Sequence, residues 1–169
     1  MRDLTLIMVG RDLLARRSEL VSINMEDLHV AEDGSGSIKI RRSKTDQEGA
    51  GAELCASPRT MEAIKRWMGD DIREGALFRR VWKGGAVGDR LSAHAVGKIF
   101  RNAVERAGID PERISGHSCR VGMAQDLVAS GCELPALMQA GRWKSAAMPA
   151  RYTERQAVRR GAVAGFYRV

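Results

Sequence analysis

Long apolar runs and paired cysteines are two features that this sequence of 169 residues lacks. Its apolar runs are only a few residues long, so no segment is expected to span a membrane. The chain opens with Arg2-Asp3 and no apolar stretch follows, so no signal peptide is expected. The three cysteines, Cys55, Cys119 and Cys132, are scattered and form no CxxC motif of a zinc site. They predict reduced thiols in a cytoplasmic protein.

Acidic residues are also scarce relative to basic ones. The chain has 28 lysines and arginines against 21 aspartates and glutamates, a net charge of +7. Residues 142–169 alone carry seven basic residues and one acidic residue. This balance favours an anionic partner, with a solvated surface as the alternative from charge alone. No acidic cluster accompanies the basic residues, which argues against a divalent-metal nuclease.

The length allows one full domain with a hydrophobic core and leaves little room for a second. Alternating segments near residues 27–30, 37–41 and 53–55 predict three short strands, and residues 69–90 appear irregular. The predicted fold is therefore mainly α, with one small three-stranded antiparallel sheet. Helices are predicted over residues 3–14, 18–23, 57–68, 92–107, 118–130, 134–141, 146–152 and 156–167.

Local signals refine the first two helices. A spacing of 3.6 residues places Leu4, Ile7, Met8 and Leu14 on one face of the first helix, which we expect to be buried. Ser18 is the predicted N-cap of the second helix.

Residues 115–120, Ser-Gly-His-Ser-Cys-Arg, begin the part of the chain that is richest in chemically active side chains. Trp143 follows Arg120 after 23 residues, and Tyr152 follows Trp143 after nine. Together with an arginine and a lysine upstream, these residues supply cations, hydrogen-bond donors and one oxygen nucleophile. Such a set suits attack on a phosphodiester. The candidate catalytic residues are Arg16, Lys44, His117, Arg120, Trp143 and Tyr152.

The order and spacing of these residues resemble the catalytic domain of the tyrosine recombinases, the phage integrase family. The resemblance covers almost the whole chain and includes RRSEL at 16–20, GHSCRVG at 116–122 and LPALMQAGRW at 134–143. Trp143 stands where many members carry histidine, which narrows the resemblance towards Cre-like members. It implies site-specific DNA recombination or integration through a 3′-phosphotyrosyl intermediate, with no metal and no cofactor. The implied partners are double-stranded DNA and further copies of the chain, as a tetramer on DNA.

The resemblance also implies a role for each residue. Tyr152 is the expected nucleophile, and Tyr167 near the C-terminus is the less favoured tyrosine. Arg16 and Arg120 are expected to bind the non-bridging phosphate oxygens, because guanidinium offers two parallel donors that lysine lacks. The family pattern selects Arg16 over the adjacent Arg17.

The remaining residues are expected to transfer protons or to orient other residues of the site. Lys44, near the tip of a predicted hairpin, is the expected general acid, although a plain phosphate contact is the alternative. His117 is expected to assist proton transfer or donate to the phosphate, and Trp143 to donate its indole N–H. Glu19 is expected to orient site residues, and Cys119 to be a small buried spacer. Further DNA contacts are expected from Arg41, Arg42, Arg142, Lys144, Arg151 and Arg155.

Members of the family carry an N-terminal DNA-binding domain that closes with the catalytic domain as a clamp. Residues 1–169 are therefore expected to be the C-terminal catalytic domain alone, without the N-terminal core-binding domain. Phe166 and Tyr167 are predicted to dock onto a neighbouring protomer. Two alternative functions stay open: type IB topoisomerase-like strand passage and a catalytically idle DNA-binding or assembly module. The complete residue set argues against the idle module.

Overall fold

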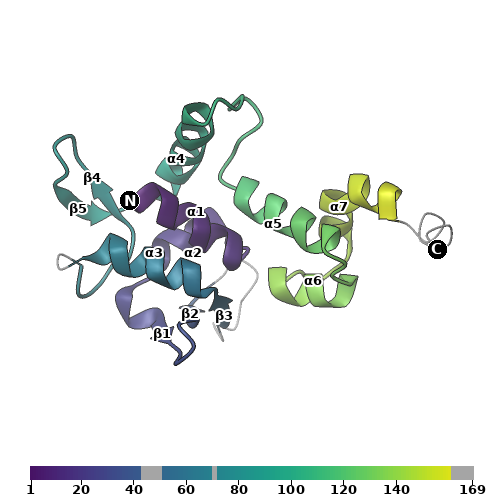
Figure 1. Ribbon diagram of the computed structural model, residues 1–169, viewed down its shortest axis with the longest axis horizontal. Coiled ribbons are helices and arrows are strands. Elements are labelled where there is room, and N and C mark those ends of the chain that lie inside the picture. The colour runs from purple at the N-terminus through teal and green to yellow at the C-terminus, as the bar shows by residue number, and fades with distance from the viewer. Residues whose placement is uncertain (43–50, 70–71, 161–169) are drawn as a thin grey trace.

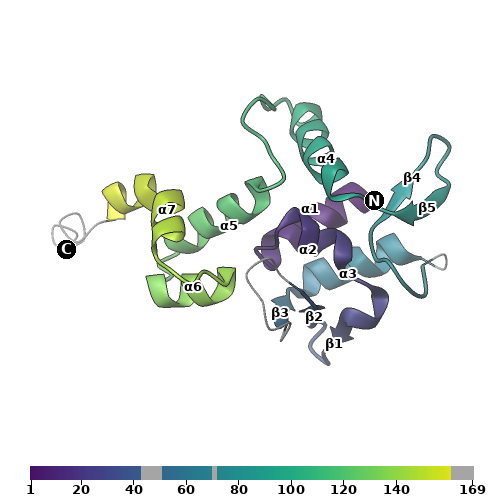
Figure 2. The same cartoon turned by 180° about the vertical axis from the view of Figure 1, so that it is seen from behind.

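The computed structural model describes residues 1–42, 51–69 and 72–160. Two opposite views show α5, α6 and α7 gathered at one end, with the strands and the other helices at the other end (Figures 1 and 2). We call residues 1–107 the N-terminal lobe and residues 118–160 the C-terminal lobe. The elements are α1 (Arg2–Asp12), α2 (Arg17–Ser22), the 3-10 helix η1 (Met25–Asp27), β1 (Leu28–Val30), β2 (Gly36–Ile40), β3 (Ala52–Ala56), α3 (Pro58–Met68), β4 (Arg79–Val81), β5 (Val87–Arg90), α4 (Ala93–Arg106), α5 (Ser118–Ala129), α6 (Leu134–Gly141) and α7 (Ala147–Arg160).

The predicted three-stranded sheet is confirmed. Its order is β1-β2-β3 with antiparallel pairing, and Ile38 of the central strand lies opposite Leu28 and Leu54. Ile38 and Ile40 are buried while Lys39 between them is exposed, as expected for a strand with one face on the core. The predicted helices 92–107, 118–130 and 134–141 are also present, as α4, α5 and α6.

The predicted buried face of α1 was wrong: Ile7 and Met8 are only partly buried, and Leu14 lies beyond the end of the helix. Leu4 is 56% exposed, whereas Thr5, Leu6 and Gly10 are buried. The hydroxyl of Thr5 donates to the carbonyl of Ala63 on α3 at 3.1 Å. At Gly10 the missing side chain lets α5 approach, because a Cβ there would lie 3.4 Å from a Cys119 atom. A search for apolar residues alone overlooks both of these contact positions.

The ends of two helices also differ from the prediction. Arg16, not Ser18, is the N-cap of α2, because the Glu19 carboxylate accepts the backbone N–H of Arg16 at 2.9 Å. Residues 147–160 form one continuous helix, α7, in place of the two that were predicted. Pro149 does not interrupt it, because its position in the first turn needs no backbone donor.

A second, two-stranded sheet was missed. The strands β4 and β5 pair in antiparallel fashion within a stretch that was predicted to be irregular. Gly84 and Gly85 turn the chain between them with φ of 98° and 93°, values that glycine accepts readily. The strands are mostly exposed on both faces, so they lack the alternating apolar pattern of a half-buried strand.

The start of α3 follows the sequence signals. The Ser57 side chain accepts from the backbone N–H of Thr60 at 3.3 Å, and Pro58 occupies the first turn. Trp67 packs against the core, and its indole N–H donates to the carbonyl of Leu77 at 2.8 Å. No helix in the described ranges is long and apolar enough to cross a membrane.

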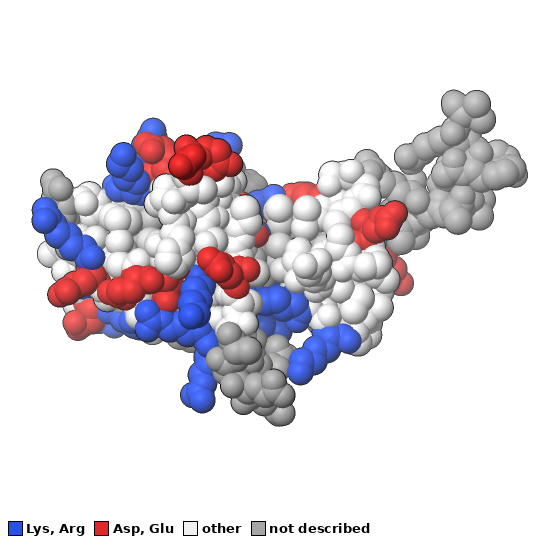
Figure 3. Space-filling model, turned by 90° about the horizontal axis from the view of Figure 1, so that it is seen from below, with Lys and Arg blue, Asp and Glu red and all other residues white. Residues whose placement is uncertain are grey.

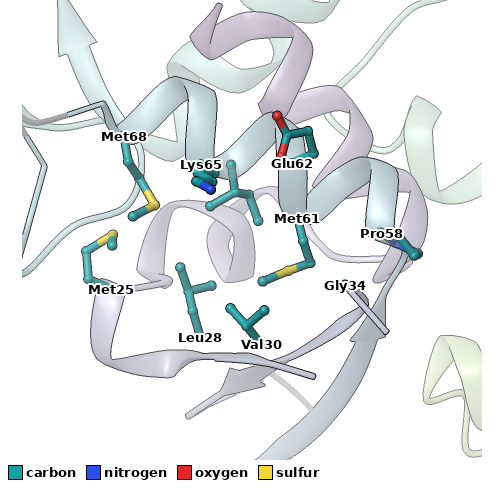
Figure 4. Close-up of a pocket in the computed structure, with 10 residues that line it drawn as sticks. Met25, Leu28, Val30, Gly34, Pro58, Met61, Glu62, Lys65 and Met68 are labelled. Atoms are coloured by element: carbon teal, nitrogen blue, oxygen red, sulfur yellow. The ribbon is translucent and has the colours of Figure 1, made fainter. Parts of the chain in front are cut away.

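A groove of about 580 Å³ lies between α3 and the first strand. Figure 4 shows Met25, Leu28 and Val30 on one side of it, with Met61 and Met68 of α3 facing them. The groove is mainly apolar, and its lining includes no member of the candidate catalytic set. It is therefore separate from the site described next.

Candidate active site

Arg120, in the first turn of α5, joins the two lobes. Its side chain is buried, and the residue is 3% exposed. One terminal nitrogen donates to the carbonyl of Leu14, just after α1, and the other donates to the carbonyl of Gly141, which ends α6. The guanidinium carbon lies 4.3 Å from the centre of the Trp143 ring. Two carbonyls and an indole thus fix the orientation of this guanidinium.

The backbone has an unusual conformation at two residues close to the carbonyls that Arg120 binds. Among the non-glycine residues that the structure describes, only Leu14 and Arg142 have positive φ, at 44° and 54°. Left-handed backbone costs a residue with a side chain about 1–2 kcal/mol. The strain therefore lies at one acceptor of Arg120 and next to the other, where the surrounding contacts maintain it.

Glu19 binds two arginines at once. Its carboxylate accepts from Nη1 of Arg16 at 2.7 Å and from Nη2 of Arg142 at 2.7 Å, besides the backbone bond that caps α2. Glu19 is 2% exposed, so both ion pairs are largely shielded from water. The side chain of Arg142 is 15% exposed and turns inward, away from the open DNA contact that its charge had predicted.

These charges influence one another. The pKa of Arg120 is lowered to about 10, mainly by burial and also by the nearby charges of Arg16 and Arg142, against the opposing effect of Glu19 and Tyr152. Burial also lowers the pKa of Arg142. At neutral pH the arginines remain cationic, so three guanidinium groups face one carboxylate. The cluster therefore has excess positive charge, and an anion would stabilise it.

Tyr152, on α7, reaches this cluster through Trp143. The two rings meet edge to face, with their centres 6.1 Å apart and an interplanar angle of 62°. The side-chain amide of Gln125 on α5 donates to the backbone carbonyl of Tyr152 at 3.1 Å. The sequence analysis missed Gln125, because a glutamine in a helix carries no signal of such a contact.

His117 and Lys44 are not joined to the cluster by any described contact. His117 precedes α5 and lies one turn before Arg120, and its imidazole is exposed, without a hydrogen-bond partner among the described residues. Lys44 lies outside the described residues. In the described part of the chain, no three His, Cys, Asp or Glu side chains gather as metal ligands.

The remaining basic residues predicted to contact DNA differ in their surroundings. Arg41 pairs with the buried Asp27 at 2.6 Å and with Glu26 at 3.8 Å, so much of its charge is balanced locally. Arg42, Lys144 and Arg151 are exposed, and the side chain of Arg155 lies outside the described residues. On the face that carries the three-stranded sheet, basic side chains lie at the junction of the two lobes, and acidic ones are interspersed with basic ones over the N-terminal lobe (Figure 3).

Residues 1–159 match the phage integrase family. The chain belongs to the phage integrase family. It is 31% identical over 157 residues to the protein named Recombinase cre of Escherichia phage P1, covering 84% of this chain and 46% of that protein. It is 34% identical over 166 residues to an integrase/recombinase xerD homolog of Selenomonas ruminantium, covering 91% of this chain and 47% of the relative. The chain thus spans about half the length of these relatives.

Solved structures share the fold of this phage integrase family member. XerH site-specific recombinase, in a post-cleavage complex with its difH substrate, has a TM-score of 0.73 at 21% identity, over 95% of this chain and 45% of that one. XerA recombinase has a TM-score of 0.72 at 16% identity, over 95% of this chain and 56% of that one. The predicted family and fold class are confirmed.

Gly141 is required by the packing of Trp143. A Cβ at position 141 would lie 1.9 Å from a carbon of the indole ring, which also packs against the guanidinium of Arg120. We expect Gly141→Ala to lower the free energy of unfolding by about 1–3 kcal/mol, through overpacking. Urea denaturation followed by circular dichroism measures this change.

Gly122→Ala is the matched control. It also adds one methyl group, but within α5, where the nearest atom would be 3.6 Å away. Replacing glycine inside a helix is expected to raise the free energy of unfolding by about 0.5–1 kcal/mol. Equal stability of Gly141→Ala and the wild type would contradict the packing argument.

Cys119 is expected to be chemically inert, as its predicted role as a spacer requires. Burial raises the pKa of its thiol to about 11, against a weaker opposing effect of Arg11. At pH 8 its reactive thiolate is therefore about 100-fold rarer than that of an ordinary thiol. We expect iodoacetamide to alkylate the exposed Cys55 at pH 8 and to spare Cys119 until urea unfolds the protein, as mass spectrometry of the peptides reports. Equal labelling of both cysteines in the folded protein would overturn this expectation.

Proposed function

We propose that this protein is a tyrosine-type site-specific DNA recombinase that cleaves and rejoins strands through a 3′-phosphotyrosyl intermediate. The observation that carries the proposal is the arginine cluster around Glu19 and its continuation through Trp143 to Tyr152. Membership of the phage integrase family supports it, as do relatives named recombinase and integrase. These names favour recombination over topoisomerase-like strand passage and over an idle DNA-binding module.

In the proposed reaction, Arg16 and Arg120 hold the two non-bridging oxygens of a DNA phosphate. The phenol of Tyr152 loses its proton, and its oxygen attacks the phosphorus. The bond from phosphorus to the 5′ oxygen breaks, and that oxygen takes up a proton. The phosphate then links the 3′ end of the cut strand to tyrosine. Because one phosphoester bond replaces another, a 5′-hydroxyl from a second strand can reverse the step without an external energy source.

In this proposal, the other predicted residues transfer protons, donate a hydrogen bond or hold the arginines in position. Lys44 protonates the leaving 5′ oxygen, because an ammonium on a long side chain can donate a proton. His117 precedes Arg120 by one helical turn, which suits an exchange of protons at the same phosphate. Trp143 adds an indole N–H, a donor that keeps its proton at neutral pH. Glu19 keeps Arg16 and Arg142 in place through its two ion pairs.

The partners and setting follow from the same proposal. XerH, whose fold this chain shares, was solved bound to a DNA substrate, and we propose double-stranded DNA as the partner here. The exposed Arg42, Lys144 and Arg151, together with Arg41 and Arg155, would contact its backbone. We further propose that the full-length protein has an N-terminal DNA-binding domain and acts as a tetramer at the nucleoid, in the cytoplasm.

Covalent trapping tests the proposed function. The protein is incubated in EDTA with a library of nicked duplexes of random sequence. In these duplexes, the short fragment that cleavage releases with a 5′-hydroxyl diffuses away. We expect a protein–DNA adduct that survives denaturing electrophoresis, and sequencing of the trapped DNA gives the target. Tyr152→Phe should abolish the adduct, because the attacking oxygen is missing.

Tyr167→Phe is the matched control, since Tyr152 and Tyr167 are the two tyrosines of the chain. It should keep the adduct. An adduct that persists in Tyr152→Phe would show that Tyr152 is not the nucleophile. Absence of any adduct from the full-length protein, on DNA that it binds, would contradict the enzymatic function itself.

A further inference from the structure

Arg142 has structural features that the mechanism above does not use. Its backbone lies in the left-handed region, with φ of 54° and ψ of 45°, where glycine is favoured. Its Nη2 binds Glu19, but its Nε and Nη1 are buried and have no hydrogen-bond partner among the described residues. Backbone strain and unpaired buried donors both oppose folding. Both features occur in Arg142, which indicates that this residue binds a ligand.

A cleft leads from solvent to Arg142. It has a volume of about 510 Å³ and lies between β3 and α6. Two carboxylates also line it, but Asp12 accepts both the backbone N–H and the hydroxyl of Ser57, and Glu53 accepts the hydroxyl of Ser37. These carboxylates therefore have donors of their own. Among the described residues, the lining of the cleft includes none of the candidate catalytic residues, and Arg142 connects the cleft to Arg16 through their shared partner Glu19. The charge of Arg142 also acts on Arg120, so Arg142 lies beside both proposed phosphate-binding arginines.

The charge of the cluster indicates which anion fits. Arg16 and Arg120 contribute two positive charges, and Glu19 removes one of them. The remaining single charge matches a resting phosphodiester. Attack by the tyrosine oxygen, after its proton has left, adds a second negative charge to the phosphorus centre. Among the described residues of the cluster, Arg142 raises the net charge from one to two positive charges, which favours this doubly charged state.

We propose that Arg142 is a third phosphate-binding arginine, whose Nε and Nη1 donate to the scissile phosphate as its second negative charge develops. Glu19 fixes the guanidinium between Arg16 and the cleft. The inference rests on the proposed function, because it assigns Arg142 to the same phosphate. Arg142 acts mainly on the transition state, so it affects the rate of cleavage more than the affinity for DNA.

Cleavage kinetics test the first part of the inference. The single-turnover rate of adduct formation is measured at saturating concentrations of the trapped duplex. We expect Arg142→Gln to lower this rate on the order of 10²-fold, with little change in the dissociation constant for DNA. Arg59→Gln removes the same charge from an exposed site on α3 and should keep the wild-type rate.

Arg142→Gly separates electrostatics from folding. Glycine relieves the left-handed backbone at this position, whereas both variants lose the ion pair to Glu19, so the melting temperature of Arg142→Gly should be higher than that of Arg142→Gln. The rate should still be as low as in Arg142→Gln. A wild-type cleavage rate in Arg142→Gly would overturn the inference.

A neutral phosphate decides whether Arg142 faces the reacting group. Replacing one non-bridging oxygen of the scissile phosphate by methyl removes one negative charge. On this methylphosphonate duplex, we expect the wild type and Arg142→Gln to react at rates within about threefold of each other, because the charge that Arg142 stabilises is absent. A defect that remains on the order of 10²-fold would show that Arg142 acts without facing the phosphate, and would overturn the inference.

An anion-binding measurement keeps this inference distinct from the proposed function. Orthovanadate adopts the five-coordinate geometry of phosphoryl transfer, and the Tyr152→Phe protein allows binding to be measured without cleavage. We expect millimolar orthovanadate to raise the melting temperature of this protein, and the rise to disappear in Tyr152→Phe/Arg142→Gln but not in Tyr152→Phe/Arg59→Gln. An equal rise in all three proteins would overturn the anion site at Arg142, whether or not the wild type cleaves DNA.

Discussion

The two bonds from Arg120 to backbone carbonyls connect parts of the chain that are far apart in sequence. Leu14 belongs to the N-terminal lobe and Gly141 to the C-terminal lobe, and one buried guanidinium binds both carbonyls. A buried guanidinium is tolerated only when it has partners, and here two of its five N–H donors reach carbonyls while the face of Trp143 covers the group. The same contacts fix the positions of the other site residues. Trp143 is held where it can meet Tyr152, and the turn at Arg142 directs that arginine towards Glu19.

This arrangement also explains why local strain is concentrated at the site. Leu14 and Arg142 both adopt left-handed backbone, which positions the carbonyls that Arg120 needs. Gly141 has no side chain where the indole ring passes. A position where strain and close contact coincide with charge is typical of a functional site, since folding alone favours none of the three.

The sequence pointed to residues that the fold brings together, but not to the contacts that hold them. Arg120 contacts Trp143, and Trp143 contacts Tyr152, while Glu19 links Arg16 to Arg142, the neighbour of Trp143. The carbonyl acceptors could not be predicted, because a backbone carbonyl carries no residue type. The inward turn of Arg142 was also hidden, because a basic residue near others appears to be part of an exposed charged surface.

The fold shows a similar division. Strongly periodic or well-capped segments such as α3 and α4 were predicted, because their apolar faces and N-caps depend on residue types that can be recognised in the sequence. The hairpin of β4 and β5 was missed, because strands that are exposed on both faces need no apolar alternation. The buried face of α1 was misjudged at Leu4, because Thr5 and Gly10 are buried for reasons other than hydrophobicity, a hydrogen bond in one case and a close approach of helices in the other.

The contacts of Tyr152 differ in kind from those of the arginines. Its ring meets Trp143 only edge to face, and its backbone carbonyl accepts one amide from Gln125. Such contacts contribute about 1–3 kcal/mol together, whereas a guanidinium bound to buried acceptors is much harder to displace. In the proposed reaction, the phosphate would therefore bind to firmly held arginines, whereas the proposed nucleophile Tyr152 is held by weaker contacts. The rate of strand cleavage would then depend on how closely α7 packs against α5, because that packing positions Tyr152.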